Sequence, residues 1–135
     1  MEDEILLNYA IQAREHSYAP YSKFKVGAAL LAEDDSIYLG CNIENAAYTP
    51  TNCAERTAFF KAVSEGQHNF KKIAIVGGSN KLIVTPPCGV CRQVMLEFCD
   101  PSKFEIILGT SKKDLKKYTL QELMPAAFFK DSLDS

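Results

Sequence analysis

Three cysteines at the starts of two predicted helices constrain the fold of this chain most strongly. Cys53 precedes an apolar run with helical spacing, and Cys88 and Cys91 form a C-x-x-C pair that opens a second such run. A helix N-terminus carries partial positive charge and free N–H groups, so it favours a thiolate over a thiol. Two such helix starts facing each other would present three thiolates to one metal ion, and zinc suits this ligand set.

Strands and helices alternate along the rest of the chain. The expected strands are a hairpin within 25–45 and buried segments at 73–78, 81–85 and 104–108. The expected helices lie near 6–13, from Asn52 to a stop at Gly66, from Gly89 to Cys99, and after a capping-box pair at Thr119 and Glu122. This order predicts one α/β domain over residues 1–135, a three-layer α/β/α fold with a mixed, roughly five-stranded sheet.

Charge and composition make several classes of partner unfavourable. The formal charge is −2, so a long polyanion is not an expected partner, and the lysines of KKDLKK (112–117) read as a solvated surface. The N-terminal residues MEDE are acidic and no apolar run is long enough to span a bilayer. We therefore expect a cytoplasmic protein that binds neither nucleic acid nor membrane, and whose five cysteines are thiols.

The number of protein ligands decides whether such a zinc site is structural or catalytic. A structural site closes with a fourth Cys or His, and the candidates in this chain are Cys41, Cys99, His16 and His68. None lies at the short sequence separation from Cys53 that is usual for a pair of zinc ligands. Cys41 remains a candidate for the fourth ligand, because a sequence does not show distances between side chains. Three ligands and one open position would instead make the zinc catalytic, with water as the fourth ligand.

Glu55 and Arg56 each have two interpretations. Glu55 is the third residue of a capping box if Asn52 is the N-cap, and it is an acid–base catalyst if the metal lies ahead of the helix start. The three cysteines favour the catalytic interpretation. Arg56 is either a surface ion-pair residue or a hydrogen-bond donor to a thiolate that offsets the net charge of −1 of zinc with three thiolates.

Five segments together resemble the small homotetrameric cytidine deaminases. The sequence Cys53-Ala54-Glu55, followed by Pro87-Cys88-Gly89-Val90-Cys91, has the three-cysteine form of the zinc deaminase signature. The resembling segments are YAPYSKFKVGAAL (18–30), GCNIENAAY (40–48), NCAERTA (52–58), PPCGVCRQV (86–94) and LMPAAF (123–128). They cover nearly the whole chain in order.

The resemblance implies hydrolysis of cytidine and deoxycytidine to uridine and deoxyuridine with release of ammonia, in pyrimidine salvage. It implies one zinc per subunit held by Cys53, Cys88 and Cys91, and a homotetramer with shared active sites. Glu55 would take a proton from water and deliver it to the ring nitrogen N3, which makes C4 open to addition.

The same resemblance implies the substrate contacts. They are Phe24 packing on the base, Asn42 and Glu44 clamping the ribose, the Ala54 backbone at the pyrimidine edge, and Tyr48 and Phe128 reaching into a neighbouring pocket. Pro86 departs from the Ser or Thr that is common at its position, so a hydroxyl is missing there. Two alternatives remain: a deaminase of a modified cytosine nucleoside, and a structural zinc module for protein or RNA binding.

Overall fold

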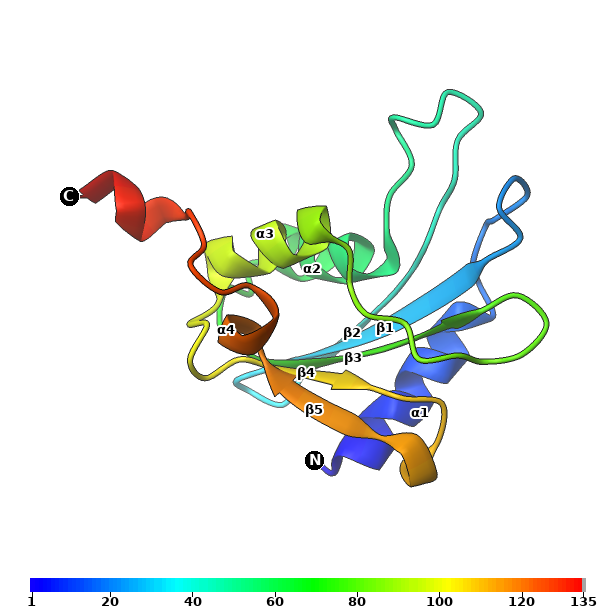
Figure 1. Ribbon diagram of the computed structural model, residues 1–135, viewed down its shortest axis with the longest axis horizontal. Helices are drawn as coiled ribbons and strands as arrows, with labels where there is room; N and C mark the ends of the chain where they lie inside the picture. Colours follow the sequence, from blue (N-terminus) through cyan, green and yellow to red (C-terminus); the bar gives the residue numbers. More distant parts are fainter. Residues whose placement is uncertain (135) are drawn as a thin grey trace.

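Five strands form one mixed sheet in the computed structural model, which describes residues 1–134 (Figure 1). The strands are β1 Lys25–Ala32, β2 Ile37–Cys41, β3 Phe70–Gly78, β4 Glu105–Leu108 and β5 Lys116–Thr119. The helices are α1 Asp3–Arg14, α2 Ala54–Ser64, α3 Gly89–Phe98 and α4 Leu120–Leu123, with short 3₁₀ helices η1 Lys112–Asp114 and η2 Lys130–Asp134. The strand order is β2-β1-β3-β4-β5, with β3 and β4 parallel and the other neighbours antiparallel.

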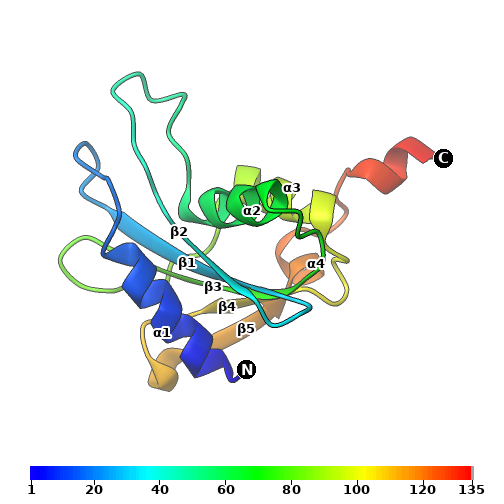
Figure 2. The same cartoon turned by 180° about the vertical axis from the view of Figure 1, so that it is seen from behind.

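Helices cover both faces of the sheet, as the two opposite views show (Figures 1 and 2). Alternate residues of a strand point to opposite faces. In β1, the strand between β2 and β3, Ala28 and Leu30 pack into the cluster beneath α2 and α3, whereas Ala29 and Leu31 pack against α1. A fully buried leucine such as Leu30 contributes roughly 2 kcal/mol through burial alone. The predicted three-layer α/β/α arrangement is confirmed.

The fifth strand is not the one that the sequence suggested. Segment 81–85 makes only one isolated bridge, between Gly77 and Ile83, and the chain turns away at Gly78, where φ is 142°. Instead β5 pairs with β4 at the edge of the sheet. The sequence did not predict β5, because its lysines interrupt the apolar pattern expected of a strand. An edge strand tolerates such charged side chains, whereas a central strand does not.

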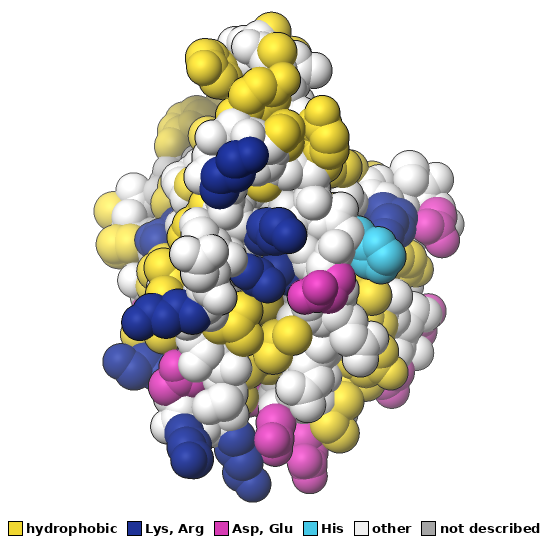
Figure 3. Space-filling model, turned by 90° about the vertical axis from the view of Figure 1, so that its right-hand side faces the viewer, with side chains coloured by type: hydrophobic (Ala, Val, Ile, Leu, Met, Phe, Trp, Pro, Cys, Tyr) yellow, Lys and Arg dark blue, Asp and Glu magenta, His cyan; other side chains and the backbone are white. Residues whose placement is uncertain are grey.

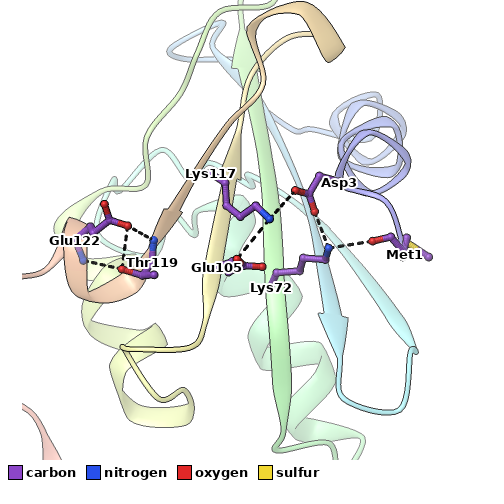
Figure 4. A network of polar contacts seen from close by, with 7 residues as sticks. All are labelled: Met1, Asp3, Lys72, Glu105, Lys117, Thr119 and Glu122. Atoms are coloured by element: carbon purple, nitrogen blue, oxygen red, sulfur yellow. Dashed lines mark hydrogen bonds and ion pairs between the residues drawn. The ribbon is translucent and has the colours of Figure 1, made fainter.

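A network of charges joins α1 to this edge of the sheet (Figure 4). Asp3 Oδ1 lies 2.6 Å from Lys72 Nζ, and Asp3 Oδ2 lies 3.3 Å from Lys117 Nζ, which also lies 3.5 Å from Glu105. Burial raises the pKa of the Asp3 carboxyl, but the hydrogen bonds and charges of the two lysines outweigh burial and lower it overall. The network therefore favours the ionised form of Asp3.

The ends of the helices agree with the predictions in two places and disagree in one. Thr119 and Glu122 form the predicted capping box at the start of α4 (Figure 4). Gly66 follows the end of α2 with φ of 93°, which is the left-handed conformation that stops a helix. The start of α2 differs from the expectation, because the N-cap residue is Cys53 rather than Asn52.

Among residues 1–134, no helix is both long enough and apolar enough to cross a membrane. The longest helix, α1, has 12 residues.

Candidate metal centre and active site

The starts of α2 and α3 meet on one face of the sheet. Cys53 is the N-cap residue of α2 and Cys88 is the N-cap residue of α3, and neither helix start has a side-chain cap. Gly40 in β2 permits the close approach of α2, since a Cβ at this position would lie 2.3 Å from Ala54 O. The uncapped N–H groups and the positive ends of two helix dipoles therefore surround the same small space.

Three sulfur atoms occupy that space. Cys53 Sγ lies 3.8 Å from Cys88 Sγ, Cys88 Sγ lies 3.5 Å from Cys91 Sγ, and all three sulfurs lie within 4.8 Å of one another. A tetrahedral zinc ion with Zn–S bonds of about 2.3 Å places its sulfurs about 3.8 Å apart. The spacing of the three thiols and their soft donor atoms fit zinc, so Cys53, Cys88 and Cys91 can hold the ion.

Within the described part of the chain, the metal-ligating cluster contains these three residues and no fourth. Cys99 is the C-cap residue of α3, at the other end of the helix from Cys88. Cys41 lines a separate cavity with His16 and Lys61. A closed four-ligand structural site is therefore not formed, and a fourth coordination position is left for water or substrate.

The charges around the sulfurs differ from one thiol to the next. A hydrogen bond from the Cys91 thiol, together with Arg56 and against the opposing effect of burial, lowers the pKa of Cys53 to about 5. The same hydrogen bond, together with burial, raises the pKa of Cys91. Without a metal the cluster tolerates one thiolate and resists a second, and a divalent cation removes that repulsion.

Arg56 lies directly behind the cluster. Its Nη2 donates to Cys53 Sγ at 3.2 Å, which places a positive charge against the thiolate, as the charge-tuning interpretation requires. Its Nε atom is buried and has no hydrogen-bond partner among the described residues. The surface ion-pair interpretation does not agree with this position.

Glu55 is buried beside the sulfurs, and only 4% of its surface is exposed. The capping-box interpretation is wrong, because α2 begins one residue later than that interpretation requires: Cys53 is the N-cap, so Glu55 occupies the second helical position. The Asn52 amide instead donates to Thr57 Oγ1. Burial, and then the negative charge of Cys53, raise the pKa of Glu55 to about 7.

A cleft of about 200 Å³ opens in front of Glu55 and the first two cysteines. Its walls come from four separate segments: Val26, Asn42, Thr51 to Glu55, and the segment that carries Thr85, Pro86 and Cys88. Sequence reasoning missed Val26, Thr51 and Thr85 as lining residues. Their only signal was their closeness in the chain to motif residues, which does not indicate where a side chain points.

Asn42 and Glu44 both bind the segment that precedes and begins β1. The Asn42 amide donates to Phe24 O at 2.8 Å and accepts from Val26 N at 2.9 Å. The Glu44 carboxylate accepts from Tyr21 N at 2.9 Å and from the Ser22 hydroxyl. The two residues lie on an extended segment after β2 rather than in a strand, and only Asn42 lines the cleft in front of Glu55. A contact of either residue with ribose stays a prediction.

The three predicted aromatic contacts lie at different places. A Cβ at Gly77 would lie 3.0 Å from Phe24 Cε1 and 2.6 Å from Thr85 Oγ1, so Phe24 adjoins the wall of the cleft. Tyr48 is 74% exposed on the loop between β2 and α2, where hydrophobic side chains gather on the protruding part of the surface (Figure 3). Phe128 is 67% exposed after α4. Within one chain, Tyr48 and Phe128 do not line this cleft.

Comparisons with known proteins agree with the fold and the cluster of thiols. Residues 1–106 match the family described as the cytidine and deoxycytidylate deaminase zinc-binding region, and the chain belongs to this family. The chain is 53% identical over 133 residues to a cytidine deaminase of Sporosarcina psychrophila, covering 98% of this chain and 96% of that protein. It is 49% identical to a cytidine deaminase of Halalkalibacterium halodurans, covering 99% of each.

A solved structure supports the same assignment. The crystal structure of a cytidine deaminase from Burkholderia pseudomallei matches with a TM-score of 0.86 and 45% identity, over 95% of this chain and 100% of that one.

Proposed function

We propose that this chain is a zinc-dependent cytidine deaminase, which hydrolyses cytidine and deoxycytidine to uridine and deoxyuridine with release of ammonia. Membership of the zinc deaminase family and 49% and 53% identity to two cytidine deaminases support this function. The observation that carries it is a buried carboxylate, Glu55, at the mouth of a three-thiol centre that leaves one position open.

The residues of the chain have separate tasks in this reaction. A zinc ion held by Cys53, Cys88 and Cys91 would lower the pKa of water to near 7. Glu55 accepts a proton from the water molecule and donates it to the ring nitrogen N3, so that C4 becomes open to addition of the water oxygen. The proton of the added hydroxyl then passes through Glu55 to the amino group, so that the C4–N bond breaks, ammonia leaves and the carbonyl of uridine forms at C4.

The cleft restricts what can reach Glu55. Its volume of about 200 Å³ suits a single base with part of its sugar. Phe24, Asn42, Glu44 and the Ala54 backbone remain the proposed contacts to base and ribose. A polynucleotide is not part of the proposal.

Replacement of Glu55 tests the reaction directly. Glu55→Gln keeps the shape of the side chain but removes the proton carrier, so deamination is expected to fall by about 10²- to 10⁴-fold while zinc content and thermal unfolding are retained. Conversion of cytidine to uridine is followed by the change in absorbance and by ammonia release. Glu97→Gln, the same exchange at an exposed site on α3, is the control. Release of uridine by Glu55→Gln at the wild-type rate would refute the proposal.

A panel of substrates separates the main proposal from a deaminase of a modified cytosine nucleoside. Cytidine, deoxycytidine, cytosine and base- or sugar-modified nucleosides are compared by kcat/KM. The proposal expects the two unmodified nucleosides to be the best substrates. A higher kcat/KM for a modified nucleoside would favour the alternative.

The proposed assembly is a homotetramer with shared active sites. Tyr48 and Phe128 support it, since both are large aromatic side chains that one chain leaves 74% and 67% exposed. Light scattering after size-exclusion chromatography is expected to give four times the mass of 15.0 kDa. A monomeric mass for the active enzyme would contradict the shared sites.

Two further parts of the proposal concern the whole chain. Residues 1–135 form one catalytic domain, which limited proteolysis would test by the absence of a stable smaller fragment. A cytoplasmic location is supported by the five cysteines, all of which are free thiols in the structure. Cell fractionation tests this location.

A further inference from the structure

Arg92, the residue that follows Cys91, holds the backbone that leads into Cys88. Its side-chain Nε donates to Pro87 O at 2.7 Å, and its backbone N–H donates to Cys88 O at 3.0 Å. Pro86 and Pro87 have no N–H groups, so the chain leading into Cys88 can be held only through its carbonyls or by packing. Arg92 therefore fastens the entry to the most exposed of the three thiols.

The same guanidinium reaches a second segment. Arg92 Nη1 donates to Leu123 O at 2.6 Å, at the last residue of α4. One half-buried planar group thus joins the chain before Cys88 to the end of α4. Arginine suits this position because its fixed donors can satisfy two carbonyls at once, which a lysine cannot reproduce.

Gln93 continues the connection. Its Nε2 donates to Phe128 O at 2.8 Å. The chain from Met124 to Phe128, directly after α4, has no regular secondary structure. It contains Ala126 with φ of 51°, a strained backbone conformation that contacts with other segments must stabilise. Arg92 and Gln93 hold its two ends.

We propose that Arg92 and Gln93 are positioning residues that couple the metal centre to the segment carrying Phe128. Arg92 sets the positions of Cys88 and Leu123. Gln93, the next residue of the same helix, sets the position of Phe128. The role given to Phe128 rests on the proposed function, whereas the coupling itself concerns only the chain and its metal.

The two residues have different expected effects, and the first test measures the metal. Arg92→Lys keeps the charge but leaves one of the two carbonyls without its donor. Zinc loss to a chelator is expected to become about tenfold faster, and the sulfur-to-cobalt absorption bands of the cobalt-substituted protein are expected to shift. Neither readout requires deamination.

The second test measures the segment. Gln93→Glu removes the donor to Phe128 O at nearly constant shape, so amide hydrogen exchange in 124–134 is expected to rise about fivefold, with zinc release unchanged. KM for cytidine is expected to rise with kcat little changed, because only the presentation of Phe128 is altered. Arg92→Lys is expected to increase exchange in the same segment.

Matched controls separate positioning from general loss of stability. Arg14→Lys removes arginine bonds of the same kind, to the carbonyls of Lys25, Gly78 and Ser79, far along the chain from the metal ligands. It is expected to lower the melting temperature without shifting the cobalt bands. Gln121→Glu makes the same exchange as Gln93→Glu on the exposed side of α4 and is expected to leave exchange in 124–134 unchanged.

The coupling is overturned if Arg92→Lys has wild-type zinc release and cobalt bands, or if Gln93→Glu exchanges no faster than Gln121→Glu. If the variants show these metal and exchange effects but the wild-type protein does not deaminate cytidine, the proposed function is contradicted and the coupling stays in place.

Discussion

Two clefts lie at opposite ends of helix α3, and each contains a cysteine at a helix end. The cleft at the start of α3 is the smaller, about 200 Å³, and holds Glu55 with Cys53 and Cys88. The cleft at the end of α3 is about 350 Å³ and is lined by Cys99 together with charged residues of both signs. Of these two clefts, the one with Cys99 has the larger volume.

The chemistry of the cysteines selects the first cleft instead. Burial alone raises the pKa of Cys99, which keeps it as an inert thiol. Cys53 has its pKa lowered, because it lies at a helix start with a neighbouring thiol and Arg56 as donors. A cysteine at the start of a helix can become a metal ligand, whereas one at the end of a helix faces carbonyls that oppose the thiolate.

The largest expected difference between the two clefts is metal binding. Cys88→Ser is expected to abolish stoichiometric zinc binding and with it deamination, while the fold is kept because Cys88 is exposed. Cys99→Ser is expected to retain one zinc per chain. Metal analysis of the two purified variants checks the comparison, and loss of zinc from Cys99→Ser would break it.

Removal of a nearby positive charge should also affect only one cleft. Arg56→Gln is expected to lower kcat/KM by about tenfold to a hundredfold, because the net negative charge of the zinc site is no longer offset. Lys103→Gln, beside Cys99, removes the same charge from the other cleft and should leave kcat/KM unchanged. Equal kcat/KM for Arg56→Gln and wild type would show that the contact with Cys53 does not tune the site.

The smallest effect is expected in the network of Asp3 with Lys72 and Lys117, which joins α1 to the sheet (Figure 4). Asp3→Asn should reduce the free energy of unfolding by about 1 to 2 kcal/mol at neutral pH, without loss of zinc. The pKa of Asp3 is lowered on folding, so this stability is complete above its unfolded value of 3.8 and is lost as pH falls through the lower folded value. Urea unfolding of both proteins should therefore give curves that converge in acid. A difference that persists unchanged below the folded pKa would assign the effect to packing rather than charge.

The layered fold was predictable from local sequence patterns, except for the strand β5, which forms by pairing with its neighbour β4. Apolar residues of β1, β3 and β4 form short dense runs, and those of α1 and α2 recur at helical spacing. The sequence suggested 81–85 as a strand because it is apolar, and passed over 116–119 because it is rich in lysine. Pairing with β4 and the charges of Asp3 and Glu105 stabilise the latter, and neither is visible in the segment itself.

The centre of the candidate site was equally predictable and its surroundings were not. Cys53, Glu55, Cys88 and Cys91 have a spacing that few other functions require, and the structure brings the three thiols together. The side chains of Asn42 and Glu44 bind the backbone of residues 21–26, and Thr85 lines the cleft. These contacts depend on how loops from four parts of the chain fold over the helix starts.

The sequence by itself indicated the three thiols that can hold a metal ion, the acidic residue near them and the alternation of strands and helices, because each is marked by short-range spacing in the chain. Only the tertiary structure decided that α2 begins at Ala54, that Glu55 is buried rather than part of a cap, and that Arg92 joins Pro87 to Leu123. Burial and long-range hydrogen bonds arise between segments that are distant in the chain, and their free energies depend on distances that a linear pattern does not contain.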